Sequence, residues 1–197
     1  MYYDFDNQLL HGTAQVFMNV AGGVIRGTGP GYMAGQMVFH FDQSDWYIHV
    51  GRPSNRLGVV MGIPIGGQTV GIKADAYLMA GTQIDPIPDP PPAVMGLLSG
   101  NYYSTARNES ALFQGKGLAF GASLSVNTGK LQMLIFYAQL QAGIGADLML
   151  ANYGDASCAG SSEQIGINGW YASGQAYAYL EGAIGIRITV FKWVHID

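Results

Sequence analysis

A pair of histidines lies in a short segment rich in residues that bind metals or sugars. His40 and His49 bracket Asp42, Asp45 and Tyr47. If residues 43 and 44 form the loop of a β-hairpin, His40 pairs with Tyr47. All five side chains then share one face, because side chains alternate along a strand. Two histidines with a carboxylate are a minimal metal set, so His40 and His49 are candidate metal ligands.

The same hairpin face also has the residue types that bind a sugar. The Tyr47 ring can stack on a sugar ring, and the carboxylates of Asp42 and Asp45 can accept hydrogen bonds from its hydroxyl groups. A polar face that only meets water would have the same composition. The opposite face is expected to be apolar and to carry Phe39, Phe41, Trp46 and Ile48.

Two aspartates occupy corresponding positions in a weak internal sequence repeat. Residues 71–75 read GIKAD and residues 143–147 read GIGAD, and apolar residues follow both. On a strand, the aliphatic side chains would face one way and Asp75 or Asp147 the other. Glycoside hydrolysis uses two carboxyl groups, one of them with a raised pKa. Asp75 and Asp147 are therefore the candidate catalytic pair, and two exposed strand acids are the simpler alternative.

Four aromatic residues gather near the C-terminal end: Trp170, Tyr171, Tyr177 and Tyr179. On a strand, Tyr177 and Tyr179 share one face, and such a ladder can bind polysaccharide by stacking. Trp170, Tyr177 and Tyr179 are therefore candidate ligand-binding residues. The alternative use of these rings is packing across strands inside the protein.

Several chemistries are excluded by what the sequence lacks. It contains no G-x-S-x-G, Walker A or H-E-x-x-H motif, and no cofactor is expected. Cys158 is the only cysteine, which rules out an internal disulfide and a cysteine-based zinc site. The nine Lys and Arg are scattered and the net charge is −4, so a nucleic-acid partner is not expected. No uninterrupted apolar run reaches about 18 residues, so no membrane-spanning segment is predicted.

The composition indicates which elements must position these residues. Hydrophobic residues make up 49% of the chain and charged residues 11%, and there are 29 glycines, which suits strands far better than long helices. The pattern predicts an all-β fold with one or two short helices, built as a sandwich or an irregular barrel of antiparallel strands. Strands are predicted at 9–20, 32–41, 46–50, 59–65, 71–80, 144–150 and 186–196, and a hairpin pairs 118–126 with 131–139.

Two segments are harder to interpret. Residues 168–184 alternate Ala with Tyr, which favours a strand, although Asn168 and four alanines would suit a helix. Five prolines in 85–92 indicate a stiff extended segment, either a linker or a strap over the surface. We favour the strap, and so expect residues 1–197 to form one β-rich domain, with a short helix at 92–100.

Three segments resemble parts of large uncharacterised proteins of Gram-negative bacteria that are secreted or surface-associated. They are GLAFGASLSVNTGKLQMLIFYA (117–138), IGINGWYASGQAYAYLEGAIGI (165–186) and the GRPSN turn (51–55) after WYIHV. The resemblance implies an extracytoplasmic location and a piece of a longer protein. It brings no assigned chemistry.

Two functions remain open at this point. The first is a non-catalytic binding or structural module of a larger extracytoplasmic protein, with polysaccharide or other parts of the parent protein as its partner. The second is a glycoside hydrolase that acts on polysaccharide through Asp75 and Asp147. The sequence leaves undecided whether the protein is an enzyme, because function must be argued from sites rather than from fold.

Overall fold

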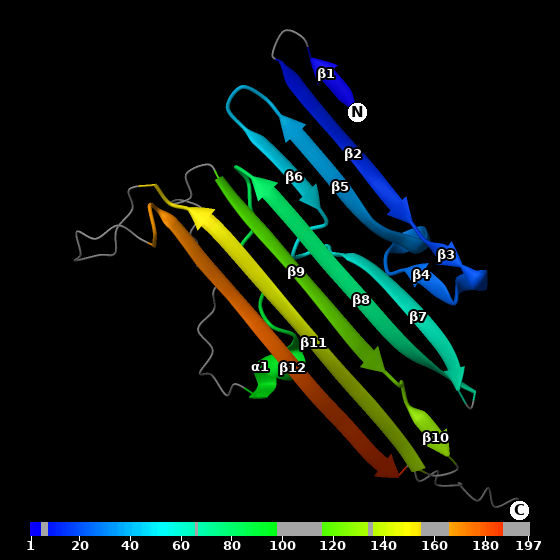
Figure 1. Ribbon diagram of the computed structural model, residues 1–197. Coiled ribbons are helices and arrows are strands. Elements are labelled where there is room, and N and C mark those ends of the chain that lie inside the picture. The colour runs from blue at the N-terminus through cyan, green and yellow to red at the C-terminus, as the bar shows by residue number, and fades with distance from the viewer. Residues whose placement is uncertain (5–7, 66, 98–115, 134–135, 155–165, 187–197) are drawn as a thin grey trace, which may run out of the picture.

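A computed structural model describes residues 1–4, 8–65, 67–97, 116–133, 136–154 and 166–186 (Figure 1). Within these residues the fold is all-β, as the composition predicts: twelve antiparallel strands form one sheet, with one short α-helix and two 3-10 turns. Among the described residues, β1, β3, β10 and β12 each pair with a single neighbouring strand. The predicted strand 186–196 lies outside the described residues after Ile186, as does Cys158.

The strands vary from two to seventeen residues. In the first half they are β1 Tyr2–Asp4, β2 Leu9–Phe17, β3 Asn19–Val20, β4 Ile25–Gly27, β5 Met33–Phe41, β6 Trp46–Val50, β7 Leu57–Ile65 and β8 Gln68–Gly81. The helix α1 spans Pro92–Leu97, and the second half contains β9 Lys116–Asn127, β10 Leu131–Met133, β11 Phe136–Asn152 and β12 Trp170–Ile186. The 3-10 turns are Ala21–Gly23 and Pro30–Tyr32.

The long strand β8 is the junction of the sheet. One of its edges pairs with β9 along its length, and the sheet continues through β11 to β12. Its other edge pairs with β7 over most of the strand and with β6 near its C-terminal end. From there one branch runs through β5 and β2 to β1, and the other through β4 to β3. Figure 1 shows β8, β9, β11 and β12 as long ribbons that lie side by side with closely aligned axes.

The register gives the sheet two different faces. Across β8, β9 and β11, Leu78, Phe120 and Leu148 are level and share a face. We call this the apolar face; on β8, β9, β11 and β12 it consists of Ile72, Ala74, Ala76, Leu78, Ala80, Leu118, Phe120, Ala122, Leu124, Val126, Phe136, Ala138, Leu140, Ala142, Ile144, Ala146, Leu148, Leu150, Ala172, Gly174, Ala176, Ala178, Leu180, Gly182 and Ile184. The opposite side, the polar face, includes Lys73, Asp75, Tyr77, Met79, Ser123, Ser125, Gln141, Asp147, Gln175, Tyr177 and Tyr179.

The buried cluster of the protein lies on the polar face. Met79 of β8 and Met149 of β11 pack with Tyr77, Ala119 and Ile87. Ile87 belongs to the proline segment, residues 85–92, which therefore lies against the polar face. The segment is also held by Gln175 of β12, whose Nε2 donates to the carbonyl oxygen of Pro88 over 2.7 Å. This packing puts α1 on the same side of the sheet (Figure 1).

The structure confirms some predicted elements and corrects others. Residues 170–186 are a strand, because all seventeen residues pair with β11. The predicted hairpin of 118–126 with 131–139 is wrong, since β9 pairs with residues 141–152 of β11. Residues 131–133 pair instead with 136–138, so the connection between β9 and β11 is itself a small hairpin. The short strand β4 lies between the predicted strands 9–20 and 32–41, where no strand was predicted.

Candidate functional site

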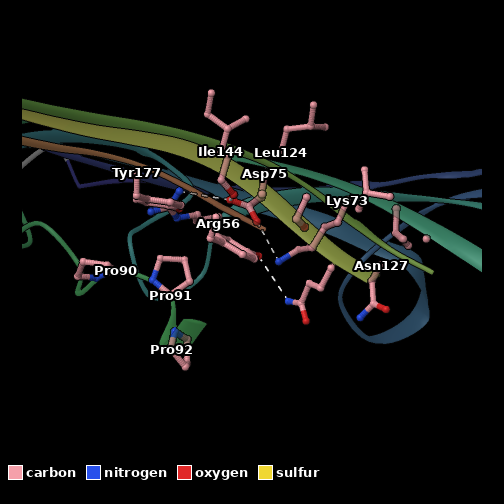
Figure 2. A pocket seen from close by; sticks show the side chains of 18 of the residues that line it. Arg56, Lys73, Asp75, Pro90, Pro91, Pro92, Leu124, Asn127, Ile144 and Tyr177 are labelled. Carbon is pink, nitrogen blue, oxygen red and sulfur yellow. Dashed lines mark hydrogen bonds and ion pairs between the residues drawn. The ribbon is translucent and has the colours of Figure 1, made fainter. Parts of the chain in front are cut away.

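Polar side chains converge on a groove on the polar face. It encloses about 560 Å³ between the sheet and the end of the proline segment. Figure 2 shows Arg56, Lys73, Asp75 and Tyr177 on the same side of the sheet as Pro90, Pro91 and Pro92, while Leu124 and Ile144 point away on the other side. The rest of the polar lining is Asp89, Ser123, Ser125, Asn127, Gln141 and Tyr179. A cavity of this size accommodates a small ligand or part of a chain.

Arg56 links the two aspartates selected from the sequence. It lies just before β7, and its Nη2 donates to Asp147 Oδ1 over 2.6 Å, while Nη1 donates to Asp75 Oδ1 over 3.3 Å. Its guanidinium also lies 5.0 Å from the centre of the Tyr77 ring, in cation–π geometry. The aspartates point to the same face but are not level, since Asp75 pairs with Ser123 and Asp147 with Gly121.

Both carboxylates are occupied by donors. Asp75 accepts from Ser123 Oγ over 2.8 Å, and Lys73 Nζ lies 2.9 Å from its other oxygen. Burial alone would raise the pKa of Asp75, but these two bonds and the charges of Lys73 and Arg56 outweigh it, so the pKa falls below its ordinary value. The Asp147 side chain is completely buried, and its second oxygen accepts from Gln175 Nε2 over 3.0 Å. The two carboxylates are therefore hydrogen-bond acceptors arranged around one arginine.

The predicted tyrosine ladder forms one wall of the groove. Tyr177 and Tyr179 of β12 lie over Gly145 and Gly143 of the neighbouring β11, their register partners. A Cβ atom at Gly145 would lie 2.4 Å from the Tyr177 hydroxyl, and one at Gly143 would lie 2.6 Å from the Tyr179 ring, so these glycines leave room for flat rings. Burial raises the pKa of Tyr177. The rings thus have one face on the backbone and an edge toward the groove.

The other ligand candidates are in the hairpin of β5 and β6, whose predicted register is confirmed by the pairs His40–Tyr47 and Val38–His49. Asp42 does not project freely from it. Its Oδ1 accepts from the Ser44 backbone N–H over 2.7 Å and from that of Asp45, and its Oδ2 accepts from His40 Nε2 over 2.9 Å. These bonds lower the pKa of Asp42. Its carboxylate therefore stabilises the turn of the hairpin.

The two candidate metal ligands share a face but are separated by an aromatic ring. Tyr47 stacks on His40 with centroids 4.9 Å apart and on His49 at 4.7 Å. His49 is buried and its Nε2 donates to the Gln83 carbonyl over 2.7 Å, and burial lowers its pKa. His40 instead lies beside His11, with 3.3 Å between their Nδ1 atoms. Among the described residues no cluster of three or more His, Cys, Asp or Glu side chains could hold a metal ion.

Trp170 is the candidate that the fold separates from the others. It pairs with Asn152, at the end of the apolar face, and so lies on the other side of the sheet from Tyr177. Tyr171, on the polar side, packs edge-on against Tyr153 with centroids 6.3 Å apart, away from the groove lining.

Sequence reasoning missed Arg56, Gln175 and His11. Arg56 and Gln175 bind Asp147 from 91 and 28 residues away, so no local spacing could indicate either contact. Comparison of the chain with protein-family models, curated proteins and solved structures gave no match. In the part of the chain that the structure describes, no helix has the length and apolar character needed to cross a membrane.

Proposed function

We propose that this chain is a non-catalytic binding module of a larger extracytoplasmic protein and that the groove on its polar face holds a polysaccharide segment. The observation that carries the proposal is the groove lining, which combines the Tyr177 and Tyr179 rings with side-chain amides and hydroxyls. Sugars present apolar C–H faces and a rim of hydroxyl groups, which match rings and amide or hydroxyl side chains respectively.

The charges around the groove weigh against the rival hydrolase. A glycosidase needs one carboxyl group that keeps a proton near neutral pH, and so has a raised pKa. Asp75 has a lowered pKa, and Asp147 is shielded from a ligand by complete burial and by its bonds to Arg56 and Gln175. Neither acid is placed to protonate a glycosidic oxygen, so binding without cleavage is the better-supported activity.

A binding and turnover screen of the purified chain tests the proposal. Soluble polysaccharides are examined by affinity electrophoresis and insoluble ones by pull-down, with reducing ends measured in the same samples. Replacing Tyr177 by Ala is expected to weaken binding roughly 2- to 12-fold, since an aromatic contact contributes about 0.5–1.5 kcal/mol. Reducing ends are expected to stay at the background level.

Tyr171→Ala is the matched control, because Tyr171 is on the same strand and side but does not line the groove. It should leave binding unchanged. Equal losses for Tyr171→Ala and Tyr177→Ala would place the ligand elsewhere. Release of reducing sugar that Asp75→Asn abolishes would make the protein a hydrolase, and no binding to any member of the panel would leave a structural role in the parent protein.

A further inference from the structure

The apolar face is exposed to an extent that water-soluble sheets avoid. Ile184 is 86% exposed, Leu180 73% and Ile144 60%, and each belongs to β11 or β12. The buried residues of β11 are on the polar face, including Asp147 at 2% exposed. A sheet that packs in water buries its apolar side and exposes its polar side. Here that arrangement is inverted, so the apolar face is built to contact something other than water.

We infer that the apolar face of β8, β9, β11 and β12 lies against the hydrocarbon of a lipid bilayer, with these strands crossing it. Alternation of an apolar residue toward lipid with a polar or small residue toward the protein is the pattern of strands in membranes. All four strands follow it in register, from Ile72 on β8 to Ile184 on β12. The groove and the Arg56 ion pairs are on the side away from lipid (Figure 2).

The chemistry of the face favours lipid over a protein partner. From the row of Ala80, Leu118 and Leu150 to the row of Ile72, Val126 and Ala142, the residues of this face include no charged side chain and none that can form a hydrogen bond. Gln68 at the start of β8 and Thr128 after β9 lie beyond that span. Protein interfaces of this extent carry about one hydrogen bond per 100–200 Å² and a polar rim. Hydrocarbon offers no hydrogen-bonding groups, and a face without any is complementary to it.

Polar and aromatic groups mark one end of the face. Lys116, Asn152 and Trp170 are level with one another across β9, β11 and β12. On the neighbouring part of the sheet, Phe41 and Trp46 stack at the corresponding end, with centroids 6.5 Å apart. Tryptophan and lysine are typical of the boundary between hydrocarbon and lipid headgroups. This row therefore fits one boundary of the bilayer.

The length of the apolar stretch matches a bilayer. On β11 it runs from Phe136 to Leu150, fourteen residue steps, or about 46 Å at roughly 3.3 Å per residue. Strands in membranes tilt by about 45°, which reduces that span to about 33 Å, and the hydrocarbon layer is about 30 Å thick. From the sequence, no membrane-spanning segment was expected because no uninterrupted apolar run is long enough. That criterion applies to helices and misses strands in which apolar and polar residues alternate.

Spin labels on one strand test the inference directly. Full-length chain with Cys158→Ser and a nitroxide at Ile144→Cys is refolded into phosphatidylcholine vesicles, and the matched control carries the label at Gln141→Cys, on the polar face of the same strand. We expect the chain to sediment with the vesicles. The label at position 144 should collide more with oxygen than with a water-soluble nickel complex, and the label at 141 should show the opposite order.

Three results would overturn the inference. One is a chain that stays in the supernatant when the vesicles are sedimented. Another is equal nickel accessibility for the two labels. The third is a label at 144 that is shielded from both reagents and broadened by a second label, which would assign the face to contact between two copies of the chain. None of these results bears on polysaccharide binding, so the two proposals fail independently.

A charge on the face gives a second measurement. Ile144→Arg should lower the vesicle-bound fraction about tenfold or more, because a charged side chain in hydrocarbon is strongly unfavourable. Gln141→Arg should leave that fraction unchanged. Equal partitioning of the two variants would contradict lipid contact, and the label measurement remains decisive if Ile144→Arg does not fold.

Discussion

Arg56 is the single residue on which the polar face most depends. It is largely buried, and it neutralises Asp147, whose side chain has no contact with solvent. The two aspartates could be selected from the sequence because strand-borne acids stand out in a chain with so few charges. Their shared cation could not be selected, since Arg56 is 91 residues from Asp147 and follows a turn that would suit any polar residue.

Arg56→Met is expected to destabilise the protein by about 3 kcal/mol or more, since it leaves a buried carboxylate without its counter-charge. The free energy of unfolding from urea titration measures the effect. Combining Arg56→Met with Asp147→Asn should recover much of the loss, because the uncompensated charge is then absent.

Arg52→Met is the matched control for this experiment. Arg52 also forms an ion pair with an aspartate, Asp85, but half of its side chain is exposed. An exposed pair contributes about 0–1 kcal/mol. If Arg56→Met costs no more than Arg52→Met, the ion pairs of Arg56 do not hold the polar face together.

At the scale of elements, local patterns predicted strands well and pairing less well. The hairpin of β5 and β6 followed from alternation and a two-residue loop, and its register is confirmed. Residues 168–184 had helical and extended features in the sequence. The structure has a strand at Trp170–Ile186, because all seventeen of these residues pair with β11. The partner of β9 was predicted wrongly because the turn at Asn127–Gly129 looks like a hairpin end, whereas Thr128 still bonds to Leu140. Pairing depends on contacts that local sequence does not contain.

The close packing of side chains on glycines within strands leads to a prediction for Gly121 of β9. A Cβ atom there would lie 2.0 Å from Asp147 Oδ1 and 2.5 Å from the Tyr77 ring, and the Arg56 bond holds Asp147 in place. Gly121→Ala should therefore destabilise the protein by about 1–3 kcal/mol, as overpacking does. Thermal and urea unfolding followed by circular dichroism measure the change.

Gly182→Ala serves as the control, because the nearest atoms to its added Cβ are 3.9 Å away. It should be neutral or stabilise by a few tenths of a kcal/mol, since alanine restricts the unfolded chain. Equal effects at the two glycines would mean that the sheet relaxes around Gly121.

The whole molecule is a sheet with two chemically different sides, and this organisation follows from period-2 alternation maintained over paired strands. This organisation was only partly visible in the sequence, because averaging hydropathy over neighbouring residues mixes the two sides of a strand. Among the described residues, the outer edge of β12 has no strand partner. Backbone groups in hydrocarbon must be paired, so contact with a bilayer requires that another strand covers the outer edge of β12.

The two sides also predict two separable activities. Tyr177 and Ile144 lie on neighbouring strands but on opposite faces, where Ile144 pairs with Ala178. Tyr177→Ala should weaken polysaccharide binding and leave vesicle partitioning unchanged, and Ile144→Arg should do the reverse. The Ile144 side chain points away from the groove that Tyr177 lines (Figure 2). The double variant should therefore show both losses without coupling. Both activities are measured on the unmodified protein, the two single variants and the double variant. If ligand in the groove changed how the sheet meets lipid, the two losses would be coupled. A coupling energy larger than about 0.5 kcal/mol would contradict independent faces.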